Sequence, residues 1–165
     1  MNALKIGWSS RDVSTTKPIN IPGQFAMRIS RGIMDPVTVT ALVIDNDEDL
    51  VVFLSADLVV FRSQLLEEIR TKVKQCLPDF PVEKIIANAT HTHTAPGHIT
   101  DKPAGKATGS STPQVDCVPH DGVEIASGDE YRDFLSGQAA EAICEAYTRR
   151  APGGISFGYG YAVVA

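Results

Sequence analysis

The sequence predicts an α/β fold, a mixed sheet with at least one strand–helix–strand crossover and two main helices. A strand pattern at 50–55, an amphipathic helix pattern at 61–77 and a strand pattern at 84–87 follow one another. This order is typical of a crossover whose two strands lie parallel. The β-branched segment 37–44 precedes the first of these strands, and turn formers separate the two, which indicates an antiparallel hairpin. A second helix is predicted at 128–150.

The amino-terminal half begins with a short strand predicted at 4–8. The polar segment 9–23 contains proline and shows no periodicity, so we expect a loop there. Apolar residues recur with the 3.6-residue period of a helix over 61–77, and Pro78 and Pro81 end this helix.

The second helix begins with a capping box formed by Ser127 and Glu130. Its predicted buried face is made of Phe134, Leu135, Ala139, Ile143, Ala146 and Tyr147. Pro152 and two glycines end the helix, and a final strand is predicted at 155–164.

The chain length favours one domain. With 165 residues, 43% of them hydrophobic, the chain can bury a sizeable core, so we expect residues 1–165 to form a single domain. Residues 97–128 lack periodicity and form a loop of about 30 residues, longer than a compact domain keeps without a function or disorder.

Composition excludes several classes of partner. Fifteen basic and 20 acidic residues give a net charge of −5, so nucleic acid is not an expected partner. Ser55 and Asp57 interrupt the longest apolar stretch, so no transmembrane segment is predicted. Residues 1–8 do not form a signal peptide, and we expect a cytoplasmic protein, or a secreted one if a signal was removed. Oligomeric state does not follow from the sequence.

Cysteine usage predicts free thiols. Cys76, Cys117 and Cys144 are odd in number and widely spaced, which disfavours both a disulfide framework and a thiolate zinc site.

The segment 88–97, Asn-Ala-Thr-His-Thr-His-Thr-Ala-Pro-Gly, brings catalytic residue types close together. If it is extended, His91 and His93 lie on the same side of the backbone, about 6.5–7 Å apart at Cα. Both imidazoles can then converge on one zinc ion, or one can bind the metal while the other faces a substrate. The simpler interpretation, histidines that only hydrogen-bond threonine hydroxyls, has about equal weight on the pair alone.

The surroundings of the pair favour the metal interpretation. Thr90, Thr92 and Thr94 offer hydroxyls that can fix the ring tautomers from a second shell. His98 and His120 are weaker candidates, because each lies in the long polar loop, where a solvated histidine is expected.

Several motifs resemble those of the neutral/alkaline, non-lysosomal ceramidases. The segment 88–97 is similar to the family's THTHSGPG-type motif, and 52–58 (VFLSADL) is similar to its VFVSxDL strand. Residues 31–33 (RGI), followed by Asp35-Pro36, resemble the RGI segment, and 6–8 (IGW) resembles the opening segment. The motifs occur in the family's order over nearly the whole chain.

The resemblance implies a zinc-dependent hydrolase that cleaves the N-acyl amide of ceramide, a lipid substrate. It implies that His91 is a zinc ligand, that His93 is catalytic and faces the developing oxyanion, and that Gly23 contacts the substrate. Asp57 is expected either to support the site or to cap the turn into the next helix.

The resemblance also implies that this chain holds only part of the site. The family's second His, its Glu and its Tyr ligands lie further along the chain, so we expect a truncated catalytic domain with its remaining ligands beyond residue 165. A zinc hydrolase acting on another amide or ester, and a binding or structural module of the same fold, remain alternatives. A serine nucleophile at Ser55 or Ser63 is disfavoured, because neither lies in a GxSxG turn.

Overall fold

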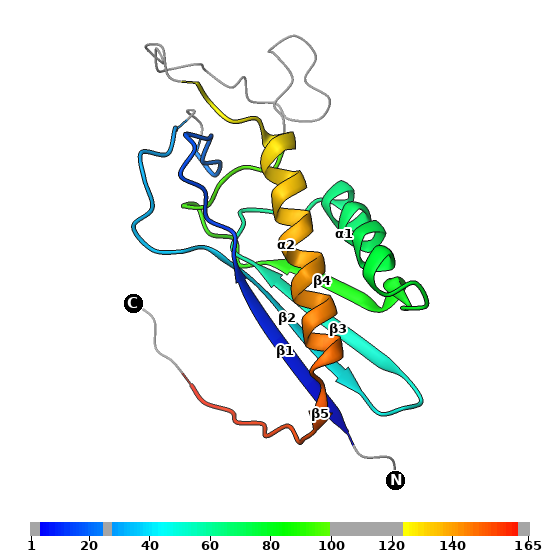
Figure 1. The fold of residues 1–165 in the computed structure, drawn as a ribbon. Helices are drawn as coiled ribbons and strands as arrows, with labels where there is room; N and C mark the ends of the chain where they lie inside the picture. Colours follow the sequence, from blue (N-terminus) through cyan, green and yellow to red (C-terminus); the bar gives the residue numbers. More distant parts are fainter. Residues whose placement is uncertain (1–3, 25–27, 100–123, 162–165) are drawn as a thin grey trace.

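A computed structural model describes residues 4–24, 28–99 and 124–161. It has one five-stranded sheet in the order β4-β3-β2-β1-β5, with both long helices on one face (Figure 1). The strands are β1 (Lys5–Asp12), β2 (Thr38–Asp45), β3 (Leu50–Ala56), β4 (Ile85–Ala89) and β5 (Ala151–Pro152). The helices are α1 (Ser63–Cys76), the short 3-10 helix η1 (Val82–Lys84) and α2 (Gly128–Thr148).

The pairing of the strands confirms the predicted mixed sheet. β2 and β3 form the antiparallel hairpin, and β1 adds to β2 antiparallel. β3 and β4 are parallel and are joined through α1, which is the predicted crossover. The carboxyl ends of β3 and β4 therefore meet at one edge of the sheet.

The core lies between the sheet and the helices. Alternate residues of each strand face the helices and are buried, including Val43 on β2 and Leu54 on β3. Leu65, Ile69 and Val73 of α1 and Leu135 and Ile143 of α2 complete the core. Within the described residues, none of the helices is long and apolar enough to cross a membrane.

Gly7 allows α2 to approach β1 closely. A Cβ atom at this position would lie 2.0 Å from the carbonyl oxygen of Ala146, so a larger residue would push the helix away. Beyond this contact, Ser9 Oγ and Arg11 Nη2 donate hydrogen bonds to Glu145 Oε2 at 2.7 and 2.8 Å. These partners on α2 explain why β1 continues to Asp12, whereas residues 9–12 were predicted to be loop.

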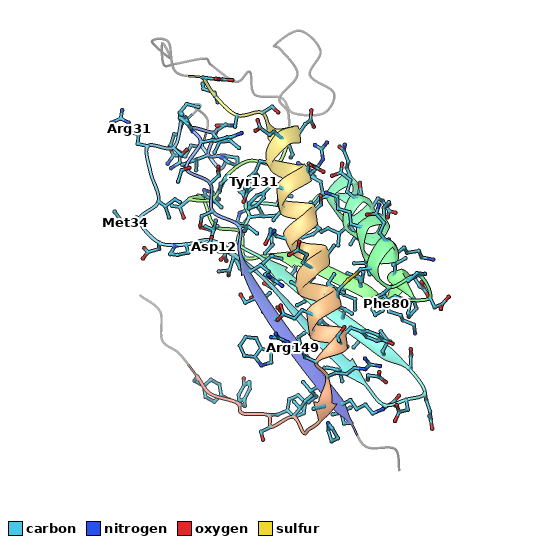
Figure 2. The ribbon with its side chains drawn as sticks, viewed as in Figure 1. Asp12, Arg31, Met34, Phe80, Tyr131 and Arg149 are labelled. Atoms are coloured by element: carbon cyan, nitrogen blue, oxygen red, sulfur yellow. A yellow bond between two sulfur atoms is a disulfide. The ribbon has the colours of Figure 1, made fainter. Side chains whose placement is uncertain are left out.

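The amino terminus of α2 confirms the predicted cap. Ser127 is the N-cap residue, and its Oγ accepts a hydrogen bond from the Glu130 N–H at 3.1 Å. The predicted buried face is confirmed at Leu135, Ala139, Ile143 and Ala146, whereas Tyr147 is half-buried and Phe134 is exposed. Figure 2 shows Tyr131 at this end of α2, near Asp12, and its hydroxyl donates to the Val13 carbonyl at 2.8 Å.

Two sequence expectations are wrong. Cys76 and Cys144 are not free thiols: they form a disulfide between α1 and α2, with Cα atoms 6.8 Å apart. A separation of 68 residues hid this pairing, which depends on the packing of the two helices. The prediction of a final strand is also wrong over the described residues 155–161, which are exposed and do not belong to a strand. Cys117 and most of the predicted loop 97–128 lie outside the described residues.

Candidate active site

The histidine segment begins where β4 ends. The Thr90 N–H donates to the Ala56 carbonyl at 3.0 Å, so the segment leaves the sheet beside the carboxyl end of β3. His91 then adopts a left-handed backbone conformation with φ of 63°, which is uncommon for a residue other than glycine. Strain of this kind is concentrated at functional sites, and here it turns the chain at the sheet edge where ligands bind in α/β folds.

The two imidazoles lie close together and are exposed to solvent. His91 Nδ1 lies 2.6 Å from the Val59 carbonyl oxygen, so this nitrogen carries the proton and Nε2 has a free lone pair. His93 Nε2 lies 3.5 Å from His91 Nε2, and the ring centroids are 5.0 Å apart. His93 is consequently assigned as the Nε2–H tautomer, since His91 Nε2 is the acceptor.

Val59 is a partner that sequence reasoning missed. Threonine hydroxyls were expected to fix the ring tautomers, but the hydrogen bond to the His91 ring comes from a backbone carbonyl, which leaves no signal in side-chain types. Thr92 Oγ1 pairs with Thr94 Oγ1 at 2.8 Å instead.

A second loop packs against His93. Gly23 has φ of +105°, and a Cβ atom there would lie 2.6 Å from His93 Cγ, so only glycine leaves room for the ring. Arg28 Nη2 donates to the His93 carbonyl at 2.5 Å and to the Pro22 carbonyl at 3.2 Å. Arg28 thus ties the glycine loop to the histidine segment, a link that its sequence position did not indicate.

Asp57 joins the histidine segment to the sheet. Its Oδ2 accepts hydrogen bonds from the backbone N–H and the hydroxyl of Thr38 at 2.8 and 3.0 Å. Its Oδ1 accepts from Thr90 Oγ1 at 3.2 Å, directly before His91. The carboxylate therefore holds both the start of β2 and the residue that precedes the candidate ligand.

A cavity of about 380 Å³ borders the histidine segment. Thr92 and Thr94 line this cavity, whereas His91 and His93, which alternate with them along the chain, do not. The rest of its wall is formed by residues 30 and 32–37 of the outer segment 30–37, by Ser14 and Thr15, and by Ile21, Asp57 and Pro96. Figure 2 shows Arg31 and Met34 on this outer segment.

The expectation of a solvated His98 is wrong. Its side chain is buried, with an exposed fraction of 2%, and its backbone carbonyl accepts from Arg132 Nη1 at 3.3 Å. Burial, reinforced by the positive charges of Arg132 and Arg62 and opposed by Glu68, lowers the pKa of His98 to about 4. The ring is therefore neutral at pH 7. His120 lies outside the described residues.

Zinc fits His91 as a ligand, because Nδ1 is held by the Val59 carbonyl and the Nε2 lone pair can face a metal ion. His93 Nε2 lies 3.5 Å from that nitrogen, so its N–H would face a group held beside the metal. The carbonyl bound to His91 Nδ1 is the usual outer partner of a metal-binding histidine. Within residues 4–24, 28–99 and 124–161, however, no group of three or more His, Cys, Asp or Glu side chains is placed to hold a metal.

Comparisons with solved structures show which proteins share this fold. No family model matches the chain, and no curated protein matches it. The chain is similar in structure to neutral ceramidase from Pseudomonas aeruginosa, with a TM-score of 0.70 and 16% identity over 93% of this chain and 23% of that one. A structure described as ceramidase complexed with C2 matches with a TM-score of 0.68 and 16% identity, over 93% of this chain and 22% of that one. The chain thus has a ceramidase-related fold and spans less than a quarter of those proteins.

Proposed function

We propose that this chain carries the histidine part of a zinc-dependent amide hydrolase that cleaves a ceramide-like lipid into a sphingoid base and a fatty acid. The observation that carries the proposal is the convergence of His91 Nε2 and His93 Nε2 at 3.5 Å, at the edge of a ceramidase-related fold. The reaction adds water across the amide, giving the carboxylic acid and the amine.

His91 is proposed to bind zinc through Nε2, while Val59 holds the proton on Nδ1. When bound, zinc polarises the acyl carbonyl and makes water a nucleophile near neutral pH. Residues of this chain are proposed to stabilise the oxyanion and to position the groups around it. His93 donates its Nε2–H to the acyl oxygen as negative charge develops there. Gly23 borders His93, and its backbone is proposed to approach the substrate there, while Asp57 and Thr90 hold the turn that orients His91.

The test is turnover of a short-chain N-acyl sphingosine by the chain with equimolar zinc, with release of the fatty acid measured by mass spectrometry. Removing an oxyanion donor costs about 10²–10³ in rate, so His93→Gln is expected to lose at least 100-fold, while Gln75→Ala, at an exposed residue near the end of α1, retains activity. Equal rates for wild type and His93→Gln would contradict the assigned role.

The described residues also favour a second candidate, a module of the same fold with an incomplete site. The absence of a three-ligand group within the described residues supports it. Stoichiometric zinc with turnover would select the hydrolase, and neither zinc nor turnover would select the module. Turnover of a simple ester or another amide, but not of N-acyl sphingosine, would keep the chemistry and change the substrate.

For location, we propose the cytoplasm, or secretion if a signal sequence was removed; the state of Cys76 and Cys144 distinguishes the two, since disulfides persist in oxidising compartments. Thiol trapping of the protein isolated from its source cells tests this: a disulfide at both positions would select secretion, and free thiols at both would select the cytoplasm.

A further inference from the structure

The face of the sheet opposite the helices carries a stretch of apolar side chains across four strands, next to the polar pairs Ser10–Thr40 and Ser55–Asn88 on the same face. Trp8 pairs with Leu42, Leu42 with Phe53, and Phe53 with Ile86, so these side chains form one row from β1 to β4. Their neighbours along each strand are buried under the helices, so the row points the other way. We call this surface the open face and define it by Ile6, Trp8, Leu42, Ile44, Val51, Phe53 and Ile86.

The open face is accessible to solvent. Trp8 is 68% exposed, Ile86 53% and Phe53 42%. With about 150–250 Å² per aromatic side chain, the open face presents on the order of 500 Å² of apolar area, at the upper end of what soluble monomers expose. All seven of its residues are uncharged.

The carboxyl-terminal segment begins beside the open face. Gly153 lies against Ile6, with 3.6 Å between the position of a Cβ atom and Ile6 Cδ1. Residues 155–161 then alternate large apolar side chains with Ser or Gly, and Phe157, Tyr159 and Tyr161 are almost fully exposed. Figure 1 shows this segment leading away from β5 at the β1 edge of the sheet. The alternation is that of a strand with one apolar face.

The apolar area of the open face and of segment 155–161 can be compared with the area that a protein–protein interface buries. A specific interface between two proteins buries about 800 Å² on each partner. The open face alone falls short of that area, but the aromatic segment 155–161 adds on the order of 500 Å². Contact between two copies that uses both elements therefore reaches the required area. An anionic membrane is disfavoured, because the net charge is −5 and the open face lacks basic residues.

We propose that the open face is a docking surface for a second copy of this chain. The two sheets pack face to face around a two-fold axis, with the aromatic segment of each copy against the edge of the other sheet. Trp8, Phe53 and Ile86 form the centre of the interface, as aromatic and large apolar residues do in stable dimers.

Sedimentation velocity of the full chain between about 5 and 200 µM tests the proposal, with Trp8 fluorescence recorded on the same samples. Trp8 is the sole tryptophan, so its emission reports burial of the open face directly. We expect a dimer with blue-shifted emission that shifts to the red as dilution gives monomer. Phe53→Lys and Ile86→Glu are each expected to weaken association at least tenfold, whereas Met34→Lys leaves it unchanged. Circular dichroism checks that each variant is folded.

Three outcomes would overturn the proposal. One is a monomer with solvent-exposed Trp8 emission at 200 µM. Another is a dimer that survives both open-face substitutions, which would place the interface elsewhere. The third is a monomer whose Trp8 emission shifts to the blue only with phosphatidylcholine vesicles, which would assign the open face to lipid.

Discussion

Replacing Gly23 by alanine tests whether the glycine loop positions His93. The new Cβ atom would lie 2.6 Å from His93 Cγ and 2.7 Å from Nδ1, whereas unstrained carbon contacts are about 3.5–4.0 Å. The ring or the loop must therefore move by about 1 Å. Alanine is also strained at φ of +105°. The strain alone is expected to lower the free energy of unfolding by about 1–3 kcal/mol, and the contact with the ring lowers it further.

The matched control is Gly32→Ala. A Cβ atom at Gly32 meets no atom within 4 Å, so this variant is expected to change stability by less than about 1 kcal/mol. Urea unfolding measures both variants, and NMR measures the nuclear Overhauser contact between the His91 and His93 ring protons. We expect this contact to be lost in Gly23→Ala and kept in Gly32→Ala. An unchanged contact and unchanged stability in Gly23→Ala would refute the packing argument.

Three further predictions concern stability. Because the pKa of His98 is about 4 in the folded protein and about 6.5 when unfolded, the unfolded state binds more protons between these values, and stability falls as pH decreases through them. His98→Gln should lack this loss, about 2–3 kcal/mol at pH 4.5 by urea unfolding; a pH dependence identical to wild type would contradict it. Burial raises the pKa of Asp45, but hydrogen bonds from the Asp47 N–H and Arg150 outweigh burial, so the pKa is lowered overall. The Asp45 carboxylate therefore stabilises the fold above about pH 4, and this contribution is lost as the pH falls further. Asp45→Asn should cost about 1–3 kcal/mol at pH 7, with a smaller difference at pH 3; an equal difference at both would argue against the ion pair. Ser127→Ala should lower stability by about 1 kcal/mol through loss of the cap, whereas Ser127→Asp should not; equal losses would contradict this.

The elements that follow from local patterns were predictable. The hairpin, the crossover and the cap at Ser127 each depend on periodicity or turn chemistry within a few residues. The Cys76–Cys144 disulfide and the burial of His98 depend instead on how α1, α2 and the loop pack together, which composition does not encode.

The candidate site was predictable in part for the same reason. His91 and His93 lie two residues apart, so their closeness follows from the chain, but the extended backbone expected for the pair is wrong, because the chain turns at His91 with φ of 63°. Arg28 acts through a backbone carbonyl 65 residues away, and Val59 offers its own carbonyl to His91 from a distance of 32 residues, so neither contact could be found from residue types.

The most direct test of the central claim is zinc binding by the full chain, measured by competition with a chromophoric chelator for wild type, His91→Ala and the control His98→Gln. We expect wild type and His98→Gln to bind one zinc with similar affinity, and His91→Ala to lose at least tenfold in affinity. Zinc affinity unchanged in His91→Ala would contradict the assignment of His91 as the metal ligand.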